Sequence, residues 1–247
     1  MSPELARAKD LVGRAKRILA FTGAGISTGS GIPDFRGEKG LWKSRRPVLF
    51  QDFMASEEAR IEHWDYKLDG YEAFRDAKPN AAHKALVELE KQGRLALLVT
   101  QNIDGLHQDA GHKPENVVEL HGTNRLIRCL SCGKESEPAA AFAVFRKTRR
   151  CPTCECGGFL KPATVSFGQA MPQEPLGRAL RAAKEADLVL AMGSTLEVEP
   201  ASSVPLAAAK RGTPYVILNL GPTAHDRRAT VKVDGDVVSI LPGLVSR

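Results

Sequence analysis

Residues 17–28 read RILAFTGAGIST, an almost entirely apolar run followed at once by a glycine-rich turn. Such short apolar runs are typical of strands that are buried on both faces of a parallel sheet. Three similar runs occur at residues 95–100, 187–192 and 215–220, and helical patterns such as residues 81–93 lie between them. The alternation of strands and helices predicts an α/β fold with a doubly wound parallel sheet.

Polar turns follow all four predicted strands: GAGIST, QNIDGLH, GSTLEVEP and GPTAHD. Ligands of open parallel sheets bind outside the carboxyl ends of the strands, so these turns predict a site for phosphate, ribose and amide groups. In the first turn, Gly23 permits a tight bend and Gly25 a close approach of the backbone to a pyrophosphate. Its third glycine position is Thr28, and about 20 residues further on LWKSRR offers no acidic partner for a ribose. The pattern therefore disfavours an ordinary dehydrogenase but is compatible with a dinucleotide.

The composition is that of a globular protein, because 43% of the 247 residues are hydrophobic and 26% are charged. The length suits one large domain, or a large domain with a small insert. No apolar run approaches the ~18 residues that span a bilayer, and the start MSPELARAKD lacks the apolar core of a secretory signal. We therefore expect a cytoplasmic protein without a membrane partner, in which clustered cysteines bind metal rather than form disulfides.

All five cysteines lie within residues 122–165, a segment that interrupts the α/β pattern. Cys129 and Cys132 form a C-x-x-C pair, and CPTCECGG follows after 18 intervening residues. Two such pairs supply the four thiolates of a structural Zn²⁺ site. Generic spacing favours Cys151 with Cys154 as the second pair, and Cys151 with Cys156 is the competing choice. A zinc module on a chain of net charge +6, with basic runs at residues 43–46 and 146–150, also has a nucleic-acid-binding alternative.

Among six histidines, His121 is the candidate general base. It ends the run NVVELHG, directly before the cysteine-bearing segment, and a neutral imidazole there can accept a proton near physiological pH. His107, in DGLH, ranks second. A second irregular stretch, residues 37–78, holds both tryptophans and predicts a small helical layer beside the cleft.

The motifs together resemble those of the sirtuins, the NAD-dependent protein-lysine deacylases of the Sir2 type. GAGISTGSGIPDFRG, TQNIDGLH, ELHG, the paired cysteines, GGFLKPATVSFG, MGSTLEVEPA and NLGPTAHD occur in the family's order. The resemblance implies a Rossmann-type large domain over residues 1–36, 79–121 and 166–247. It also implies a small domain made of a helical module, 37–78, and a zinc module, 122–165. NAD and an acyl-lysine protein substrate would enter between the domains, and nucleic acid is not an expected partner.

The resemblance further implies the site residues. The implied NAD-binding set is Gly23, Ala24, Gly25, Ile26, Thr28, Pro33, Asp34, Phe35, Arg36, Gln101, Asn102, Ile103, Asp104, Gly193, Ser194, Thr195, Asn219 and Val237. The substrate peptide would add as a strand against Val165, Phe167, Gly168 and Val198. The catalytic residues would be His121, Asn102 and Asp104. In the implied reaction, Asp104 and the Ile103 backbone hold the departing nicotinamide, and His121 deprotonates a ribose hydroxyl. Free lysine and O-acetyl-ADP-ribose result.

The family also bears on the zinc ligands. In many sirtuins the last zinc cysteine directly precedes Gly-Gly, as Cys156 does here, and the desuccinylating branch spaces its last two ligands as Cys151 and Cys156 are spaced. The resemblance therefore implies Cys129, Cys132, Cys151 and Cys156 as ligands, with Cys154 spare.

Two departures bear on the substrate. The family's FGE reads FGQ at Gln169. Desuccinylating members carry a Tyr and an Arg on the helix before the PNAAH segment, and that register gives Asp65 and Leu68 here. Without an Arg for a bidentate carboxylate contact, simple deacetylation is predicted. The alternatives are other acyl groups, mono-ADP-ribosyl transfer and NAD hydrolysis.

Overall fold

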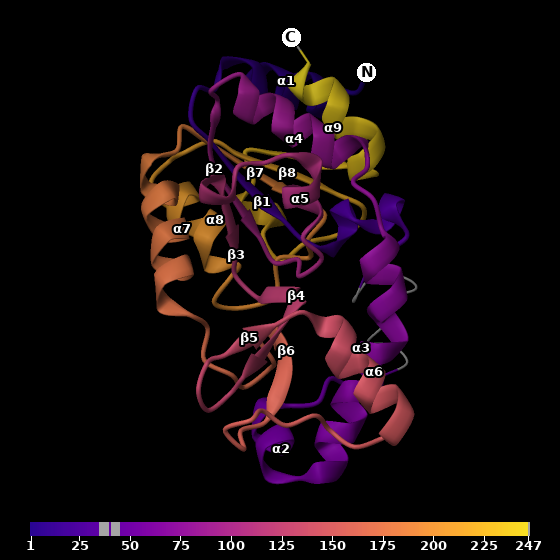
Figure 1. Ribbon diagram of the computed structural model, residues 1–247. Coiled ribbons are helices and arrows are strands. Elements are labelled where there is room, and N and C mark those ends of the chain that lie inside the picture. Colours follow the sequence, from indigo (N-terminus) through magenta and orange to yellow (C-terminus); the bar gives the residue numbers. More distant parts are fainter. Residues whose placement is uncertain (35–39, 41–44, 247) are drawn as a thin grey trace.

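The computed structural model describes residues 1–34, 40 and 45–246, and within them a six-stranded parallel sheet forms the centre of the larger domain (Figure 1). The strand order is β3-β2-β1-β7-β8-β9. These strands are β1 (Ile18–Thr22), β2 (Leu95–Thr100), β3 (Val117–Glu119), β7 (Leu188–Met192), β8 (Tyr215–Asn219) and β9 (Val231–Asp234). Every residue of β1, β7 and β8 is buried, which explains their unbroken apolar character. The predicted doubly wound α/β fold is confirmed.

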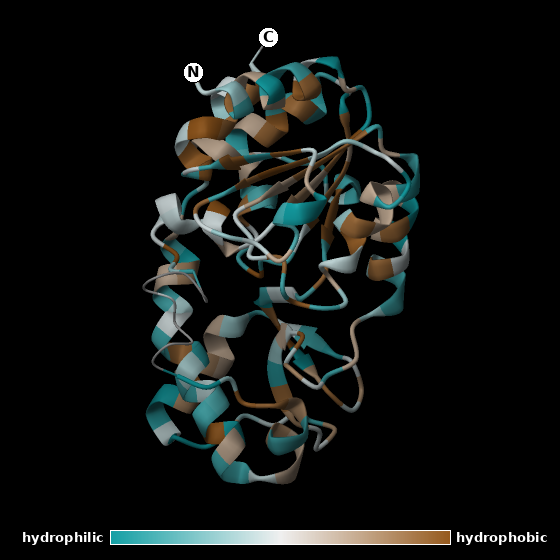
Figure 2. Cartoon of the chain, turned by 180° about the vertical axis from the view of Figure 1, so that it is seen from behind, coloured by the Kyte–Doolittle hydropathy of each residue, from teal (hydrophilic) through white to brown (hydrophobic). Residues whose placement is uncertain are grey.

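Helices cover both faces of this sheet. On one face lie α1 (Pro3–Arg14), α4 (Ala81–Lys91) and α9 (Val237–Val245), and on the other α7 (Gln173–Glu185) and α8 (Ser203–Ala209). Alternate residues of β1 enter the two cores, because Ile18 and Ala20 pack with the first group of helices and Leu19 and Phe21 with the second. Figure 2 shows the hydrophobic strands as a brown layer between the helices.

The order of the strands creates the binding edge. From β1 the chain goes on to β2 on one side of the sheet, while β7 pairs with the other side of β1. The two halves of the sheet therefore diverge between β1 and β7, and a crevice opens outside the carboxyl ends of these strands. The glycine-rich turn that follows β1 lies at this point.

The smaller domain joins the two irregular segments of the sequence. An antiparallel sheet of order β5-β4-β6 contains β4 (Gly122–Cys129), β5 (Glu135–Ser136) and β6 (Leu160–Thr164). It packs with α2 (Phe50–Ala55), α3 (Glu57–Asp76) and α6 (Pro138–Thr148). Phe53 and Trp64 share a buried core with Ile127, Phe142 and Phe145. The boundaries predicted for the two domains stay a prediction.

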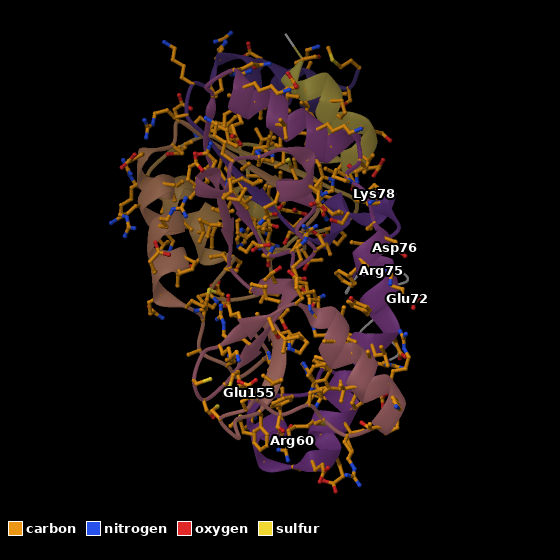
Figure 3. All side chains as sticks on the ribbon, in the orientation of Figure 1. Arg60, Glu72, Arg75, Asp76, Lys78 and Glu155 are labelled. Carbon is orange, nitrogen blue, oxygen red and sulfur yellow. The ribbon has the colours of Figure 1, made fainter. Side chains whose placement is uncertain are left out.

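The basic run at residues 146–150 contributes ion pairs to the packing of α6 on α3. Arg146 pairs with Glu72, and Arg149 pairs with Asp65. Figure 3 labels Glu72 on α3, near the Arg75–Asp76 ion pair that ends this helix. Two arginines of the run are thus used within the small domain. None of the helices in the described part of the chain has the length and apolar character that crossing a membrane requires.

Candidate active site

The glycine-rich turn packs against the turn after β7, backbone to backbone. Gly23 donates its N–H to the Met192 carbonyl at 3.0 Å, and Gly25 donates to the Gly193 carbonyl at 2.9 Å. A Cβ on Gly25 would lie 2.8 Å from Gly193 Cα, and one on Gly193, where φ is +61°, would lie 2.5 Å from the Ile26 nitrogen. These glycines are therefore required by the packing of the two turns, and Ala24 and Gly25 of η1 (Ala24–Ile26) line the cleft.

A buried polar network connects this turn with the turn after β2. Asn102 Nδ2 donates to the Gly23 carbonyl and to Ser27 Oγ, each at 3.2 Å. Ser27 Oγ in turn donates to Asp104 Oδ2 at 2.7 Å. Asp104 also accepts the Leu106 N–H at 2.9 Å. Burial raises the pKa of Asp104, while the bonds from Leu106 and Ser27 act in the opposite direction. The network holds two predicted catalytic residues, Asn102 and Asp104, within one hydrogen-bond chain.

Asn80 ties the glycine-rich turn to α4. Its side chain caps the helix by accepting the Ala82 N–H at 2.9 Å, and its Nδ2 donates to the Ile26 carbonyl at 2.8 Å and to Ser30 Oγ at 2.9 Å. Asn80 and Ser27 were not among the site residues predicted from the sequence. The available signal was the position of Asn80 just before a helical pattern, which is typical of an N-cap.

His121 lies where β3 gives way to the small domain, and it lines the cleft. Its Nδ1 is 3.0 Å from the Gln101 carbonyl oxygen, which can only accept a hydrogen bond. In the neutral ring the proton therefore sits on Nδ1, and the lone pair sits on Nε2. The Val165 N–H donates to the His121 carbonyl at 2.8 Å, so the histidine is joined to the start of the predicted peptide loop.

That loop follows β6. The Phe50 N–H donates to the Phe167 carbonyl at 2.8 Å, and the Phe167 side chain is 36% exposed beside the cleft. Gln169 Oε1 accepts the Ser166 N–H at 3.1 Å, and the Gln169 N–H donates to the Ser166 carbonyl at 3.0 Å. The departure from the family's glutamate thus keeps an acceptor that closes the turn.

A cavity of about 1520 Å³ separates the two domains. Most of the implied ligand-binding residues line it: Gly23, Ala24, Gly25, Thr28, Asp34, Gln101, Asn102, Ile103, His121, Val165, Phe167, Gly168, Gly193, Ser194, Thr195, Val198, Asn219 and Val237. Three predicted residues are described by the structure but do not line the cavity: Ile26, Pro33 and Asp104. Of these, Ile26 packs into the core beside α9. Phe35 and Arg36 lie outside the described residues.

The small domain contributes one helix face that sequence reasoning missed. His63, Tyr66 and Lys67 of α3 line the cavity, and Lys67 Nζ donates to Asn124 Oδ1 at 3.0 Å. Burial lowers the pKa of Lys67 to about 8. Asp65 and Leu68, the positions inferred from the desuccinylase register, instead face Arg149 and the small core. The sequence predicted only that residues 37–78 are helical. It did not indicate which side of the helix faces the cleft.

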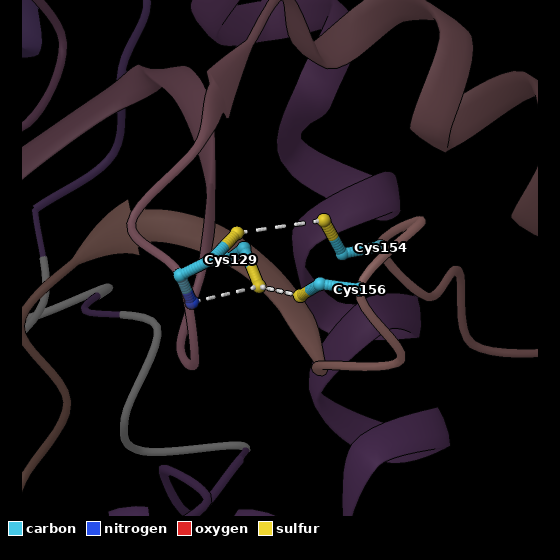
Figure 4. Close-up of side chains that lie close together, drawn as sticks. Cys129, Cys154 and Cys156 are labelled. Atoms are coloured by element: carbon cyan, nitrogen blue, oxygen red, sulfur yellow. Dashed lines mark hydrogen bonds between the residues drawn. The ribbon is translucent and has the colours of Figure 1, made fainter.

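Four cysteines form a cluster in the small domain (Figure 4). The sulfur atoms of Cys129, Cys132, Cys154 and Cys156 lie within 4.8 Å of one another. The Sγ–Sγ distances are 3.5 Å between Cys129 and Cys156 and 3.8 Å between Cys132 and Cys154. Tetrahedral Zn²⁺ with bonds of about 2.3 Å places its sulfurs about 3.8 Å apart, so the cluster fits a structural zinc ion.

The choice of Cys151 as a ligand is corrected by this geometry. The Cys154 N–H donates to the Gly158 carbonyl and the Gly157 N–H donates to the Cys154 carbonyl, both at 2.8 Å. This tight turn brings Cys154 and Cys156 together opposite Cys129 and Cys132. Cys151, before the turn, packs against the core of the small domain. Cys154 therefore takes the place in the ligand set that the family resemblance implied for Cys151.

An open parallel sheet with a glycine-lined cleft at its switch point, together with a small domain that carries a four-cysteine cluster, is typical of a dinucleotide-using protein with a structural metal site. The Sir2 family matches residues 23–200. The chain belongs to the Sir2 family.

Relatives agree over nearly the whole chain. The NAD-dependent protein deacetylase of Rhodopseudomonas palustris is 42% identical, covering 94% of this chain and 92% of that protein. The deacetylase of Thermodesulfovibrio yellowstonii is also 42% identical, covering 96% and 95%. A solved structure of a Sir2 protein with a p53 peptide and NAD⁺ is 35% identical with a TM-score of 0.88, covering 99% of this chain and 97% of that one.

Proposed function

We propose that the cavity between the domains is the active site of an NAD-dependent protein deacetylase, in which His121 is the general base. The activity follows from membership of the Sir2 family and from relatives that are named as NAD-dependent protein deacetylases. A related Sir2 structure contains a deacetylated p53 peptide together with 3′-O-acetyl ADP ribose. The observation that carries the role of His121 is the bond from its Nδ1–H to the Gln101 carbonyl, which makes Nε2 the basic nitrogen of the neutral ring in a residue that lines the cavity.

The residues present fit NAD. When bound, NAD supplies the ADP-ribosyl group that accepts the acetyl group, and nicotinamide is released. The backbone of residues 23–25 would face the phosphates, because these residues follow the carboxyl end of β1 and line the cavity. Asn102 and Gln101 offer amides for a ribose, and Ile103 and Asp104 lie next to them in the chain. Asn219 and Val237 line the cavity beside the ends of β8 and β9 and would meet the adenosine side.

In the proposed reaction His121 takes a proton from a ribose hydroxyl onto Nε2. The Gln101 carbonyl remains bonded to Nδ1–H and therefore stabilises the imidazolium that forms. The Ser27–Asp104 and Ser27–Asn102 bonds hold the opposite side of the site rigid. Because the cavity lies between two domains, the closed complex excludes water that would otherwise compete with the acetyl-lysine.

The protein partner is proposed to bind as an extended peptide between two segments. One is the loop after β6 with Val165, Phe167 and Gly168, and the other is the turn after β7 with Val198. The exposed ring of Phe167 offers apolar contact to the acyl-lysine stem. Nucleic acid is not a proposed partner, since two arginines of the basic run at residues 146–150 already pair with carboxylates of α3.

The four-cysteine site is proposed to be structural. Four thiolate ligands leave no open position for a substrate, and none of the four cysteines lines the cavity in the described part of the structure.

A panel of acylated peptides tests this function. Mass spectrometry of acetyl-lysine and succinyl-lysine peptides, each with and without NAD, should show NAD-dependent loss of the acetyl group and little loss of succinyl. The cationic side chain on the cavity face of α3 is Lys67, and its amine cannot make the bidentate contact with a carboxylate that an arginine would make. Equal rates on both peptides would overturn the acetyl preference. Nicotinamide release with no change in either peptide would indicate ADP-ribosyl transfer or NAD hydrolysis instead.

A further inference from the structure

We propose that His107, Thr22 and Thr100 form a buried hydrogen-bond relay that positions Asn102 in the active site, with His107 as the positioning residue at its base. The inference rests on the proposed function, because it concerns the same cavity. None of the three relay residues lines that cavity.

The relay starts from the register of the sheet. Thr22 ends β1 and Thr100 ends β2, and the two are paired in the parallel ladder. Their side chains point to the same face of the sheet, so Thr22 Oγ1 donates to Thr100 Oγ1 at 2.8 Å. Both threonines are buried, at 0% and 2% exposure. A hydroxyl pair at the ends of two central strands is not needed to fill space, since valine has the same shape.

The second link runs from Thr100 to the catalytic turn. The Asn102 N–H donates to Thr100 Oγ1 at 3.0 Å. The same residue sends its side-chain amide to Gly23 and Ser27 in the cleft. Thr100 therefore fixes the backbone of the residue whose side chain enters the active site.

The third link is His107, in α5 (Leu106–Ala110), directly beyond the catalytic turn. Its Nε2 lies 3.0 Å from Thr22 Oγ1. The ring is 1% exposed and packs on His83 at a centroid distance of 4.9 Å. Burial holds the pKa of His107 well below its usual range, so the ring is neutral and has a single N–H. Since Thr22 donates to Thr100, it accepts from His107, which places that proton on Nε2.

The direction of the relay follows from these contacts. His107 Nε2–H donates to Thr22, Thr22 donates to Thr100, and Thr100 accepts from the Asn102 backbone. Without His107, the Thr22 hydroxyl loses the donor that fixes its orientation. The Thr100 hydroxyl, which accepts the Asn102 N–H, is then no longer held in place by Thr22. A misplacement of a catalytic group by about 1 Å costs about a hundredfold in rate.

The test removes one donor at a time and restores it. We expect Thr22→Val and His107→Leu to lower kcat for deacetylation about tenfold to a hundredfold. Thr22→Ser, which keeps the hydroxyl, and His107→Gln, which keeps an N–H at the position of Nε2, should recover most of the loss. Tyr215→Phe is the matched control, because it removes another buried hydroxyl, which is bonded to His225. Tyr215 begins β8, at the end of the strand away from the cavity, so this variant should leave kcat unchanged.

A double-mutant cycle separates positioning from mere stability. In the Asn102→Ala background, Thr22→Val should cause no further loss of kcat, because the relay acts through the Asn102 side chain. Additive losses, or wild-type kcat in Thr22→Val, would overturn the proposal. If His107→Leu fails to fold, Thr22→Val carries the test alone.

A failure of the relay can be distinguished from a failure of the proposed function. If the wild-type enzyme releases no acetyl group, the proposed function fails, and the relay is then judged by the Kd of NAD from calorimetry. A weaker Kd in Thr22→Val that disappears in the Asn102→Ala background supports the relay. An unchanged Kd refutes it.

Discussion

At the scale of single residues, the glycines beside the cleft act through what their missing side chains allow. The motif predicted glycines at positions 23 and 25. The structure shows that a Cβ at either position would collide with Gly193, which packs against the same turn. Ser27 and Asn80 escaped prediction because their value lies in partners more than 50 residues away in sequence, Asp104 and the Ile26 carbonyl. Such long-range bonds leave no periodic trace in a single sequence.

Gly193→Ala tests this packing. The new Cβ would meet the Ile26 nitrogen at 2.5 Å and would also carry the cost of the left-handed backbone, about 1–2 kcal/mol. We expect a loss of NAD affinity and a larger fall in unfolding free energy than in the control Gly212→Ala. Gly212 has φ +84° but nothing within 4 Å of its Cβ position, so only the backbone cost applies. Equal losses of stability in the two variants, measured by denaturant titration, would contradict the packing account.

At the scale of elements, the strands of the large sheet were visible in the sequence, as was the presence of a small domain, but the internal arrangement of the small domain was not. Strands β1, β2, β7 and β8 fall within one residue of their predicted apolar runs, because burial on both faces leaves a continuous signal. In α3 only a minority of positions are buried, and its cleft-facing residues His63, Tyr66 and Lys67 follow no apolar pattern. The turn at Cys154–Gly158 depended on backbone bonds that spacing does not encode.

Serine replacements decide the zinc ligands. Cys154→Ser and Cys156→Ser should each lose most of the bound zinc and lower the melting temperature of the protein, because their sulfurs lie in the cluster. Cys151→Ser is the matched variant, three residues before Cys154, and should keep one zinc per chain. Metal content by mass spectrometry provides the measurement. Loss of zinc in Cys151→Ser with retention in Cys154→Ser would restore the set that the sequence suggested.

At the scale of the whole molecule, buried histidines link stability to pH. Burial, together with the charges of Lys67 and Lys161, lowers the pKa of His63 to about 2, while the unfolded value is about 6.5. Between these values the unfolded chain binds one proton more than the folded chain. The unfolding free energy therefore falls as the pH falls, by about 1.4 kcal/mol per pH unit for this histidine.

His63→Leu removes this proton uptake. Its unfolding free energy, measured by denaturant titration between pH 6 and pH 5, should fall less steeply than that of the wild type by about 1.4 kcal/mol per pH unit. Comparing the two proteins cancels the effect of acid on the cysteine cluster, which both share. Parallel slopes would show that His63 is not held neutral in the folded protein.

The two domains meet at one cavity, and the residues that line it come from strand ends of the large sheet and from α3 and the β6 loop of the small domain. The proposed acetyl transfer would need all of these at once, since NAD and the peptide are proposed to bind on different walls of the cavity. His121 stands at the junction, bonded through Nδ1 to Gln101 and through its carbonyl to Val165.

The most direct measurement follows acetyl-lysine loss and nicotinamide release in parallel, for the wild type and His121→Ala. We expect equal amounts of free lysine peptide, nicotinamide and O-acetyl-ADP-ribose in the wild type, and a loss of deacetylation of about 10²–10⁴-fold in the variant. Near-wild-type deacetylation by His121→Ala, or nicotinamide release by the wild type with the peptide left intact, would contradict it.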